Sequence, residues 1–212
     1  MDAEVGKLLD MGIIEESCHE AGEVISSVFL VRKVDGSHRM ILNVKQFNES
    51  VEYEHFKVEN LSAATQMMKR GYFIASVDLR HAYYSVSIKP EFRKFLKFKW
   101  KGQLYAYTCF ANGLCNCPRY LTKLLKPVYA HLRSQGFLSA SFIDDCYLKG
   151  QTYEGCQENV ERSVELFFKT LGFTVTLKSQ FWCLVKKLKC LGFWFNSEDM
   201  TVPLSEEKNT EN

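Results

Sequence analysis

Two adjacent acidic residues interrupt an apolar, β-rich stretch of this chain. In the run SFIDDCYL, Asp144 and Asp145 stand between Leu138–Ile143 and Cys146–Leu148, which predicts two short strands around a tight hairpin with both acids at its tip. Asp-Asp suits such a turn poorly, because two-residue turns favour Asn-Gly or Asp-Gly and because adjacent carboxylates repel each other. A divalent cation would remove this repulsion, since Mg²⁺ takes carboxylate oxygens as ligands.

A third acid, Asp78, follows the apolar run Phe73–Val77, where a charge needs a partner. Each acid also has a simpler interpretation: Asp144 and Asp145 as a solvated turn, and Asp78 as the cap of the turn that follows it. Taken together, the acids suggest that two strands bring three carboxylates to one edge of a sheet. Such an arrangement is typical of a two-metal centre for phosphoryl transfer.

The size and composition of the chain predict an ordinary folded protein. Its 212 residues are 46% hydrophobic and 25% charged, which favours one domain or two small subdomains that share a core. No stretch approaches the roughly 18 consecutive apolar residues of a membrane helix, so we expect no membrane partner. The N-terminus lacks a signal-peptide pattern, and the eight cysteines lie mostly in apolar runs without a CxxC pair. We therefore expect an intracellular, reduced protein that is not secreted and has no structural zinc.

Helical and β-rich patterns alternate along the sequence, and several strand pairs have the signals of hairpins. This order predicts an α+β fold with a mainly antiparallel sheet. Helices are predicted at residues 4–14, 60–70, 118–131 and 154–171, with Pro127 kinking the third and Gly172 closing the fourth. Strands are predicted at residues 24–33, 39–44, 73–79, 84–88, 104–109, 138–143, 146–148, 173–177 and 188–195.

The net charge of +2 does not by itself indicate a nucleic-acid-binding protein, but one basic run stands out. Residues 89–101 hold six basic residues and one acid, interleaved with aromatic residues. Such a run suits a polyanion that lies along one face. A half-buried strand with a solvated lysine face explains the alternation equally well, so both interpretations stay open.

Several segments in a characteristic order carry a family resemblance. VDLRHAYYSVSI, NGLCNCPRYLTKLLKPV and FIDD follow one another with the spacing of a reverse transcriptase domain, and the chain resembles such domains most in DIRS-type and gypsy-type retrotransposons. The resemblance implies a right-hand polymerase palm, an antiparallel sheet backed by helices, with a fingers subdomain in two pieces and essentially no thumb. The implied order is a first fingers segment (residues 1–52), a first palm segment (53–85), a second fingers segment (86–117), a second palm segment with primer-grip-like strands (118–197) and the start of the thumb or tail (198–212), all within one domain.

The resemblance also implies roles for the acids. Asp78, Asp144 and Asp145 match the three catalytic aspartates, and the backbone carbonyl of Leu79 would complete the metal shell. In the family, the residues that match Asp78 and Asp144 hold two Mg²⁺ ions, with Mn²⁺ as an alternative ion, and the residue that matches Asp145 is needed but lies further from the metals. Lys178 matches a lysine proposed to protonate the leaving pyrophosphate, a general-acid role. Without the resemblance, Lys178 would be interpreted as a surface lysine.

Further positions match nucleotide-binding and primer-binding residues of the family. Lys33 and Arg39 stand at the basic positions of a hairpin that grips the triphosphate. Tyr83 matches the bulky side chain that excludes a 2′-hydroxyl, although a packed aromatic beside Tyr84 is the alternative. The remaining matches are Asn112 and Gly113 for the nucleotide, and Leu191 and Gly192 for the primer grip.

The sequence also departs from the family pattern. Ala111-Asn112 replaces the usual Pro-(Phe or Gln), which affects a position that contacts nucleotide or template. The resemblance implies an RNA-directed DNA polymerase that uses an RNA or DNA template with a primer, and deoxynucleoside triphosphates. It also implies that further polyprotein domains, a thumb and an RNase H, are missing from this sequence. The alternative is a weak or inactive retrotransposon-derived remnant that binds nucleic acid or a protein. A nucleotide cyclase is disfavoured by the fingers-like segment.

Overall fold

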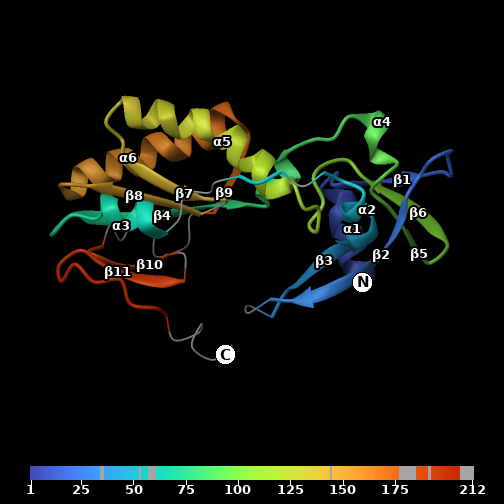
Figure 1. Cartoon of the computed structure of the whole chain (residues 1–212), viewed down its shortest axis with the longest axis horizontal. Coiled ribbons are helices and arrows are strands. Elements are labelled where there is room, and N and C mark those ends of the chain that lie inside the picture. Colours follow the sequence, from blue (N-terminus) through green and yellow to red (C-terminus); the bar gives the residue numbers. More distant parts are fainter. Residues whose placement is uncertain are drawn as a thin grey trace. The chain divides into compact units, whose positions relative to one another are not determined.

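The secondary-structure elements of the chain fall into two units in a computed structural model (Figure 1). The structure describes residues 1–33, 36–52, 54–56, 61–143, 145–176, 185–190 and 192–205, without the side chains of residues 61, 63, 142, 175 and 176. Unit 1 comprises Met1–His55 and Tyr83–Pro118, and unit 2 comprises Phe56–Ala82 and Arg119–Asn212. Each unit therefore combines segments that are distant in the sequence.

Unit 1 is built on a five-stranded sheet with the order β1-β6-β5-β2-β3. All neighbouring strands are antiparallel except β2 and β5, which are parallel. Its elements are α1 (Asp2–Asp10), β1 (Ile14–Ser17), β2 (Ile25–Arg32), β3 (His38–Asn43), α2 (Lys45–Glu49), the 3₁₀ turn η1 (Ala82–Ser85, which begins at the last residue of a unit 2 segment), α4 (Pro90–Arg93), β5 (Lys97–Trp100) and β6 (Gln103–Tyr107).

The core of unit 1 lies between α1 and the sheet. Val5 and Leu8, on one face of α1, are buried against Met40 and Leu42 of β3 and Phe98 of β5. The i, i+3 spacing of the α1 residues and the alternation along β3 present one apolar face each, and burial of these faces drives their association.

Unit 2 is built on a four-stranded antiparallel sheet with the order β7-β8-β4-β9, beside a separate β10-β11 hairpin. The predicted mainly antiparallel sheet is thus present here. Its elements are α3 (Leu61–Met67), β4 (Phe73–Arg80), α5 (Cys117–Ser134, whose first two residues belong to unit 1), β7 (Ser139–Phe142), β8 (Asp145–Gly150), α6 (Tyr153–Glu165), the π-helical turn η2 (Leu166–Thr170), β9 (Thr174–Thr176), β10 (Lys187–Cys190) and β11 (Phe193–Asn196).

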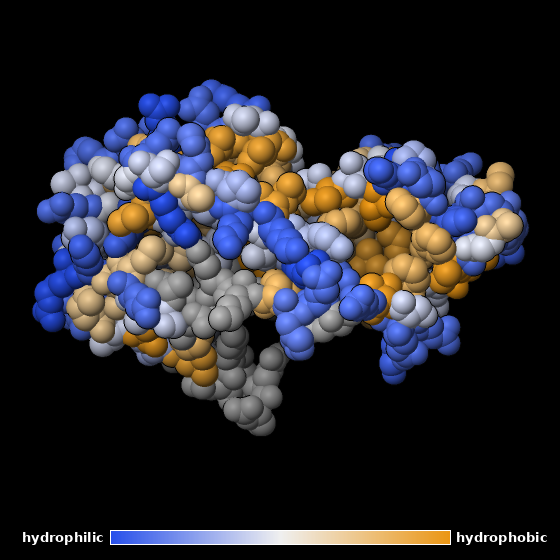
Figure 2. Space-filling model, turned by 45° about the horizontal axis from the view of Figure 1, so that its top comes forward, coloured by the Kyte–Doolittle hydropathy of each residue, from blue (hydrophilic) through white to orange (hydrophobic). Residues whose placement is uncertain are grey.

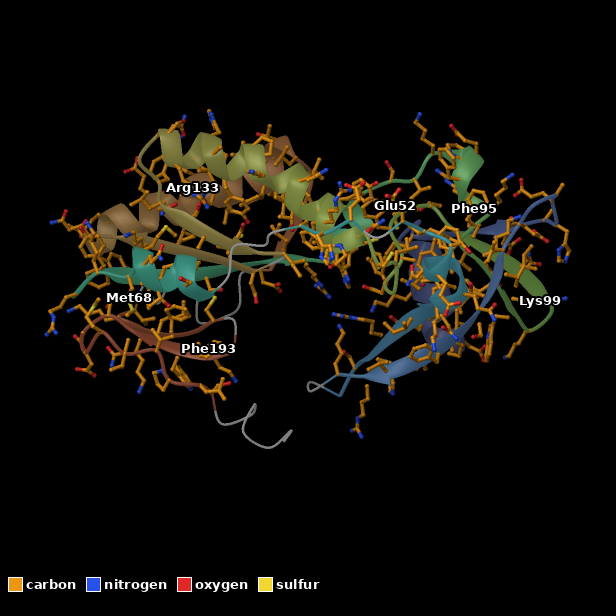
Figure 3. The ribbon with its side chains drawn as sticks, in the orientation of Figure 1. Glu52, Met68, Phe95, Lys99, Arg133 and Phe193 are labelled. Carbon is orange, nitrogen blue, oxygen red and sulfur yellow. The ribbon has the colours of Figure 1, made fainter. Side chains whose placement is uncertain are left out.

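Both faces of the unit 2 sheet are covered. Helices α5 and α6 lie on one face, where the Tyr129 hydroxyl of α5 is 2.5 Å from Cys146 Sγ of β8 (Figure 1). The other face carries α3 and the β10-β11 hairpin, whose Phe195 ring lies 5.1 Å from the ring of Tyr147. Met68, directly after α3, and Phe193 of β11 belong to the same cluster (Figure 3). The central strand β4 is therefore buried on both sides, which explains its continuous apolar run.

Local signals in unit 2 fix the ends of its helices. The Thr152 hydroxyl accepts a hydrogen bond of 3.0 Å from the Gly155 amide and caps α6. Arg133, near the end of α5, donates to the Ser139 carbonyl at 2.9 Å and links that helix to β7 (Figure 3). The helix continues through Pro127, where the sequence predicted a kink.

Several predicted boundaries are wrong. The helix predicted at 4–14 ends at Asp10, because Gly12 takes a φ of 66° and Ile14 enters β1 opposite Tyr107. The segment 84–88 forms the end of η1 and an isolated bridge at Ser87, and no strand. The strand predicted at 188–195 is a hairpin, in which Gly192 turns the chain with a φ of 76°.

The helix predicted at 154–171 also differs, because α6 ends at Glu165 and continues as the π-helical turn. Gly172 follows that turn with the expected positive φ, 71°. In contrast, the hairpin predicted from residues 24–33 and 39–44 is confirmed as β2 and β3.

Two further observations concern the chain as a whole. Within the described residues, no helix is both long and apolar enough to cross a membrane. Seven of the eight cysteines lie in the described ranges, all as free thiols, and Cys109, Cys117, Cys146, Cys156 and Cys190 are buried. Burial raises the pKa of Cys109 to about 11 and that of Cys117 to about 12, so these thiols stay neutral and pack as small apolar groups.

Candidate active site

Asp78 and Asp145 face each other across two neighbouring strands of unit 2. Asp78 lies near the end of β4, Asp145 is the first residue of β8, and the two are direct partners in the antiparallel register. Side chains alternate along each strand, so both acids stand on the face that also carries Ser76 and Tyr147. Both residues are half-buried. The register thus brings together two carboxylates from segments that are far apart in the sequence.

The turn before Asp145 differs from the prediction by one residue. Because Phe142 pairs with Asp145, Asp145 belongs to the strand β8 rather than to the tip of the hairpin. Ile143 has a φ of 58°, as a two-residue hairpin loop requires. For a β-branched residue, such a backbone conformation costs about 1–3 kcal/mol. The β7-β8 and β4-β8 pairings hold the hairpin tip in this strained form.

This site suits a divalent cation by the chemistry of its donors. Carboxylates directly opposite each other on a sheet repel, and hard cations such as Mg²⁺ prefer carboxylate oxygens. Within the described residues, no group of three or more His, Cys, Asp or Glu side chains has the geometry of a metal site. Asp144, the third acid of the predicted set, lies outside those residues. Leu79 follows Asp78 in β4, and its buried side chain holds no oxygen or nitrogen atom. Only its backbone carbonyl is therefore a candidate ligand.

Two of the predicted nucleotide-binding residues lie on the β2-β3 hairpin of unit 1. Arg39 is exposed on β3, opposite Val31 of β2, and Lys33 directly follows β2. The Lys33 amide donates to the Ser37 carbonyl at 2.8 Å, which holds the two arms of the hairpin together beyond the strands. The hairpin thus presents two cations at its end.

A second pair of residues in unit 1 comes together through a side-chain hydrogen bond. The Asn112 amide donates from Nδ2 to the Tyr84 hydroxyl at 2.7 Å. Tyr83, the predicted sugar-contacting residue, precedes Tyr84 in η1 and is half-buried. Burial raises the pKa of Tyr84 to about 12, and the nearby Cys109 adds to the rise while the Arg39 guanidinium opposes it. Tyr84 therefore stays neutral at physiological pH, close to two of the predicted nucleotide-binding residues.

Gly113 occupies a position that no other residue fits. Its φ is 117°, and a Cβ there would lie 2.6 Å from the Leu42 carbonyl oxygen and 3.3 Å from Val44 Cγ2. The Asn48 side chain holds the same loop from α2. Its Nδ2 donates to the Gly113 carbonyl at 2.9 Å, and its Oδ1 accepts from the Cys115 amide at 3.1 Å. The loop that carries Asn112 is therefore fixed against β3 and α2.

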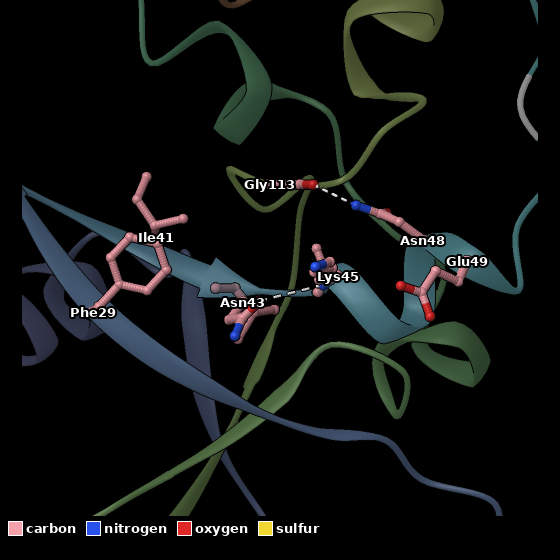
Figure 4. Close-up of a pocket in the computed structure, with 9 residues that line it drawn as sticks. Phe29, Ile41, Asn43, Lys45, Asn48, Glu49 and Gly113 are labelled. Carbon is pink, nitrogen blue, oxygen red and sulfur yellow. Dashed lines mark hydrogen bonds between the residues drawn. The ribbon is translucent and has the colours of Figure 1, made fainter.

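A pocket of about 420 Å³ opens beside this loop (Figure 4). Phe29 and Ile41 form an apolar wall, and Lys45, Asn48 and Glu49 line the other side. The wall continues along β2 into Ile25 and Val31, which are 45% exposed each, and Figure 2 shows apolar side chains gathered over unit 1. An apolar wall with a polar rim suits a flat heterocycle such as a nucleobase.

Three of the remaining predicted residues belong to unit 2. Lys178 and Leu191 lie outside the described residues. Gly192 turns the chain between β10 and β11, and its carbonyl accepts a hydrogen bond of 3.0 Å from the Ser205 amide. Residues 201 and 204 form bridges with β11, so this stretch of the predicted thumb or tail packs onto the hairpin.

Three of the six basic residues in the run at 89–101 pair with acids within unit 1, so only part of the run is left to meet a polyanion. Lys97 is buried and pairs with Glu20 at 2.7 Å and with Glu23 at 2.9 Å. Arg93 pairs with Glu15, and Lys101 pairs with Asp2. Exposed lysines of the run include Lys99, which points away from the sheet (Figure 3). The acids come from α1, β1 and the loop before β2, and the sequence pattern of the run alone could not reveal them.

Sequence reasoning missed two residues that shape the site, Tyr84 and Asn48. Tyr84 lies 28 positions from Asn112, and Asn48 lies 65 positions from Gly113. Neither contact has a local signal, because both depend on how distant segments of the unit pack. The departure at Asn112 from the family pattern was the only hint that the neighbours of this residue differ.

Comparisons with known proteins identify the family of the chain and its fold. A family model described as "Reverse transcriptase (RNA-dependent DNA polymerase)" matches residues 31–195. The Pro-Pol polyprotein of Simian foamy virus type 1 is 23% identical over 176 residues, which cover 82% of this chain and 14% of the polyprotein. The Gag-Pol polyprotein of Gibbon ape leukemia virus is 24% identical over 191 residues, which cover 84% of this chain and 11% of that protein. The chain spans only a small share of these relatives, and the DIRS-type or gypsy-type subgroup stays a prediction.

Solved structures show the same fold. The foamy viral protease-reverse transcriptase in complex with double-stranded DNA has a TM-score of 0.82 at 19% identity, covering 97% of this chain and 41% of that one. The same kind of protein with an RNA/DNA hybrid has a TM-score of 0.76 at 18% identity, covering 96% of this chain and 26% of that one. The predicted α+β palm-and-fingers fold is thereby confirmed.

Proposed function

The chain belongs to the reverse transcriptase (RNA-dependent DNA polymerase) family, and we propose that it catalyses RNA-directed DNA synthesis, adding deoxynucleotides to a primer 3′ end. The observation that carries this proposal is the register of β4 and β8, which sets Asp78 opposite Asp145 within the matched residues. Two carboxylates that face each other on neighbouring strands repel, and a bound cation offsets that repulsion. Such a pair can hold cations for phosphoryl transfer.

Reverse transcriptases use divalent metal ions, and we propose two Mg²⁺ ions here, with Mn²⁺ as an alternative. Asp78, Asp144 and Asp145, together with the Leu79 carbonyl, would hold them. When bound, such ions lower the charge of the reacting phosphates and favour ionisation of the primer hydroxyl. The carboxylates orient this centre, while Lys178 would supply a proton to the leaving pyrophosphate.

Unit 1 would bind the nucleotide and the template in this scheme. We assign unit 1 to the fingers and unit 2 to the palm. Lys33 and Arg39 would contact the triphosphate, where a point charge and a planar guanidinium suit phosphate oxygens. Tyr83 would lie against the sugar, and Leu191 with Gly192 would seat the primer end.

The pocket of unit 1 would take a base of the template strand against Phe29 and Ile41, since aromatic rings stack with bases regardless of sequence. Related proteins have been solved with double-stranded DNA and with an RNA/DNA hybrid, which supports a template-primer duplex as the partner. Because the relatives are much longer, we also propose that a thumb and an RNase H act together with this domain.

A primer-extension assay tests the proposal. The full chain is incubated with a homopolymer RNA template, a DNA primer, the matching deoxynucleotide and Mg²⁺. We expect extension by the wild type and a loss of at least about 100-fold in Asp78→Asn and Asp145→Asn, because each removes a charge that holds the cations. Glu158→Gln is the matched control, since it neutralises an acid of α6 in the same unit. Equal extension by wild type and both aspartate variants would refute the proposal.

A further inference from the structure

Tyr84 and Asn112 form a side-chain pair that the proposed mechanism does not yet use. Tyr84 lies in η1 and Asn112 in the loop after β6, and their hydrogen bond of 2.7 Å is partly buried within unit 1. The phenol accepts this bond from the amide nitrogen. A neutral phenol can keep this role throughout the physiological pH range, since its pKa lies far above that range.

This bond fixes the orientation of the Asn112 amide. A side-chain amide carries donors on its nitrogen and an acceptor on its oxygen. With Nδ2 bound to Tyr84, the amide is held against rotation, and the half-buried Asn112 makes no other side-chain hydrogen bond to the residues that the structure describes. The acceptor Oδ1 and the second N–H of Nδ2 are therefore left for a ligand, and each has a fixed direction.

The backbone beneath Asn112 is equally restrained. Gly113 packs so closely on β3 that a Cβ would lie 2.6 Å from the Leu42 carbonyl oxygen, and Asn48 binds both Gly113 and Cys115. A fixed backbone combined with a fixed amide is a preorganised acceptor, and such groups contribute to binding without a cost of ordering at the moment of contact.

We propose that Tyr84 is a positioning residue, which holds the Asn112 amide so that Oδ1 accepts a hydrogen bond from a donor group of the incoming deoxynucleotide. This inference rests on the proposed polymerase function. It assigns to the tyrosine hydroxyl a role in nucleotide affinity rather than in chemistry, because the phenol touches Asn112 and acts through it.

Single-nucleotide incorporation kinetics test this role. We expect Tyr84→Phe to raise the KM for the deoxynucleotide about three- to tenfold, as for the loss of one oriented hydrogen bond, with kcat changed less than about twofold. Asn112→Ala should raise KM by a similar or larger factor. The double variant should be no worse than Asn112→Ala, because the two residues act as one unit.

Tyr107→Phe is the matched control. The Tyr107 hydroxyl is fully buried in the same core and has no hydrogen-bond partner among the described residues, so its removal should leave KM unchanged. Thermal unfolding of each variant reports whether a loss of nucleotide affinity comes from a loss of the fold.

The outcomes separate the two proposals. A wild type that extends primers, with a Tyr84→Phe variant of unchanged KM, overturns this inference and leaves the polymerase function standing. Additive losses in the double variant also overturn it, since they mean that Tyr84 acts independently of Asn112. A wild type that extends no primer refutes the proposed function, and this inference with it.

Discussion

Replacing Asp145 by asparagine removes one of two negative charges that face each other across β4 and β8. We expect this change to stabilise the metal-free protein, although it would abolish a catalytic group. The same reasoning applies to Asp78→Asn. Either variant alone removes the repulsion, so the double variant should gain little more than each single one.

The size of the effect follows from the register. Direct partners in an antiparallel sheet have Cβ atoms about 4.5–5.5 Å apart. Two unit charges about 5 Å apart in a water-like dielectric repel by about 0.8 kcal/mol, which agrees with the roughly 0.2–1 kcal/mol typical of charged pairs at such positions. For a chain of this size, that gain corresponds to a rise in Tm of about 2–3 °C.

Mg²⁺ should reverse the order of stability. At about ten times its dissociation constant, a ligand that binds only the folded state adds about 1.4 kcal/mol. The wild type should gain this amount, and Asp78→Asn and Asp145→Asn should gain far less. Glu158→Gln, which neutralises an acid of α6 in the same unit, should respond to Mg²⁺ as the wild type does.

The assay is chemical or thermal unfolding of the four proteins and the double variant, with EDTA and with increasing Mg²⁺. A double-mutant cycle in EDTA isolates the interaction between the two aspartates. A coupling energy near zero in EDTA would show that these carboxylates do not repel each other. An equal Mg²⁺ response in the wild type and the aspartate variants would show that they do not share a cation.

Three further changes test other regions of the structure. Gly113→Ala should destabilise the protein by at least about 2 kcal/mol in urea unfolding, because alanine at a φ of 117° is strained and its Cβ would meet the Leu42 carbonyl; a change below about 0.5 kcal/mol would contradict this. Gly150→Ala should cost about 1–3 kcal/mol or more in the same measurement, since the added Cβ would overlap the Cys156 backbone nitrogen and lie 2.5 Å from its Cα; an unchanged midpoint would count against this packing. Hydrogen bonds from His19 and then from Lys97 lower the pKa of Glu23 from 4.5 to about 2. The stability that this carboxylate contributes is therefore complete above pH 4.5 and is lost as the pH falls toward 2. In Glu23→Gln the decline of the urea midpoint between about pH 5 and pH 2 should therefore be shallower than in the wild type, and parallel curves would exclude this linkage.

The amino-acid sequence alone determined the elements whose signals are local. The alternating residues on both sides of Gly36 predicted the β2-β3 hairpin, and the apolar run at Phe73–Leu79 predicted β4. Periodic apolar residues also predicted α5, even through Pro127. Such patterns are readable because a residue's place in a helix or strand, and the face it buries, repeat every few positions along the chain. The family resemblance added the expected roles of the acids.

The tertiary structure alone decided which of these residues meet. Asp78 lies opposite Asp145, Tyr84 binds Asn112, and Lys97 binds acids from a loop more than 70 positions earlier. Local pattern also failed at Ile14, which joins β1 because a strand partner more than 90 positions away is present. Register and ion pairing between distant segments depend on the packing of the whole unit. Their free energy is shared among residues that no short window of sequence contains, so only the folded chain fixes the candidate site.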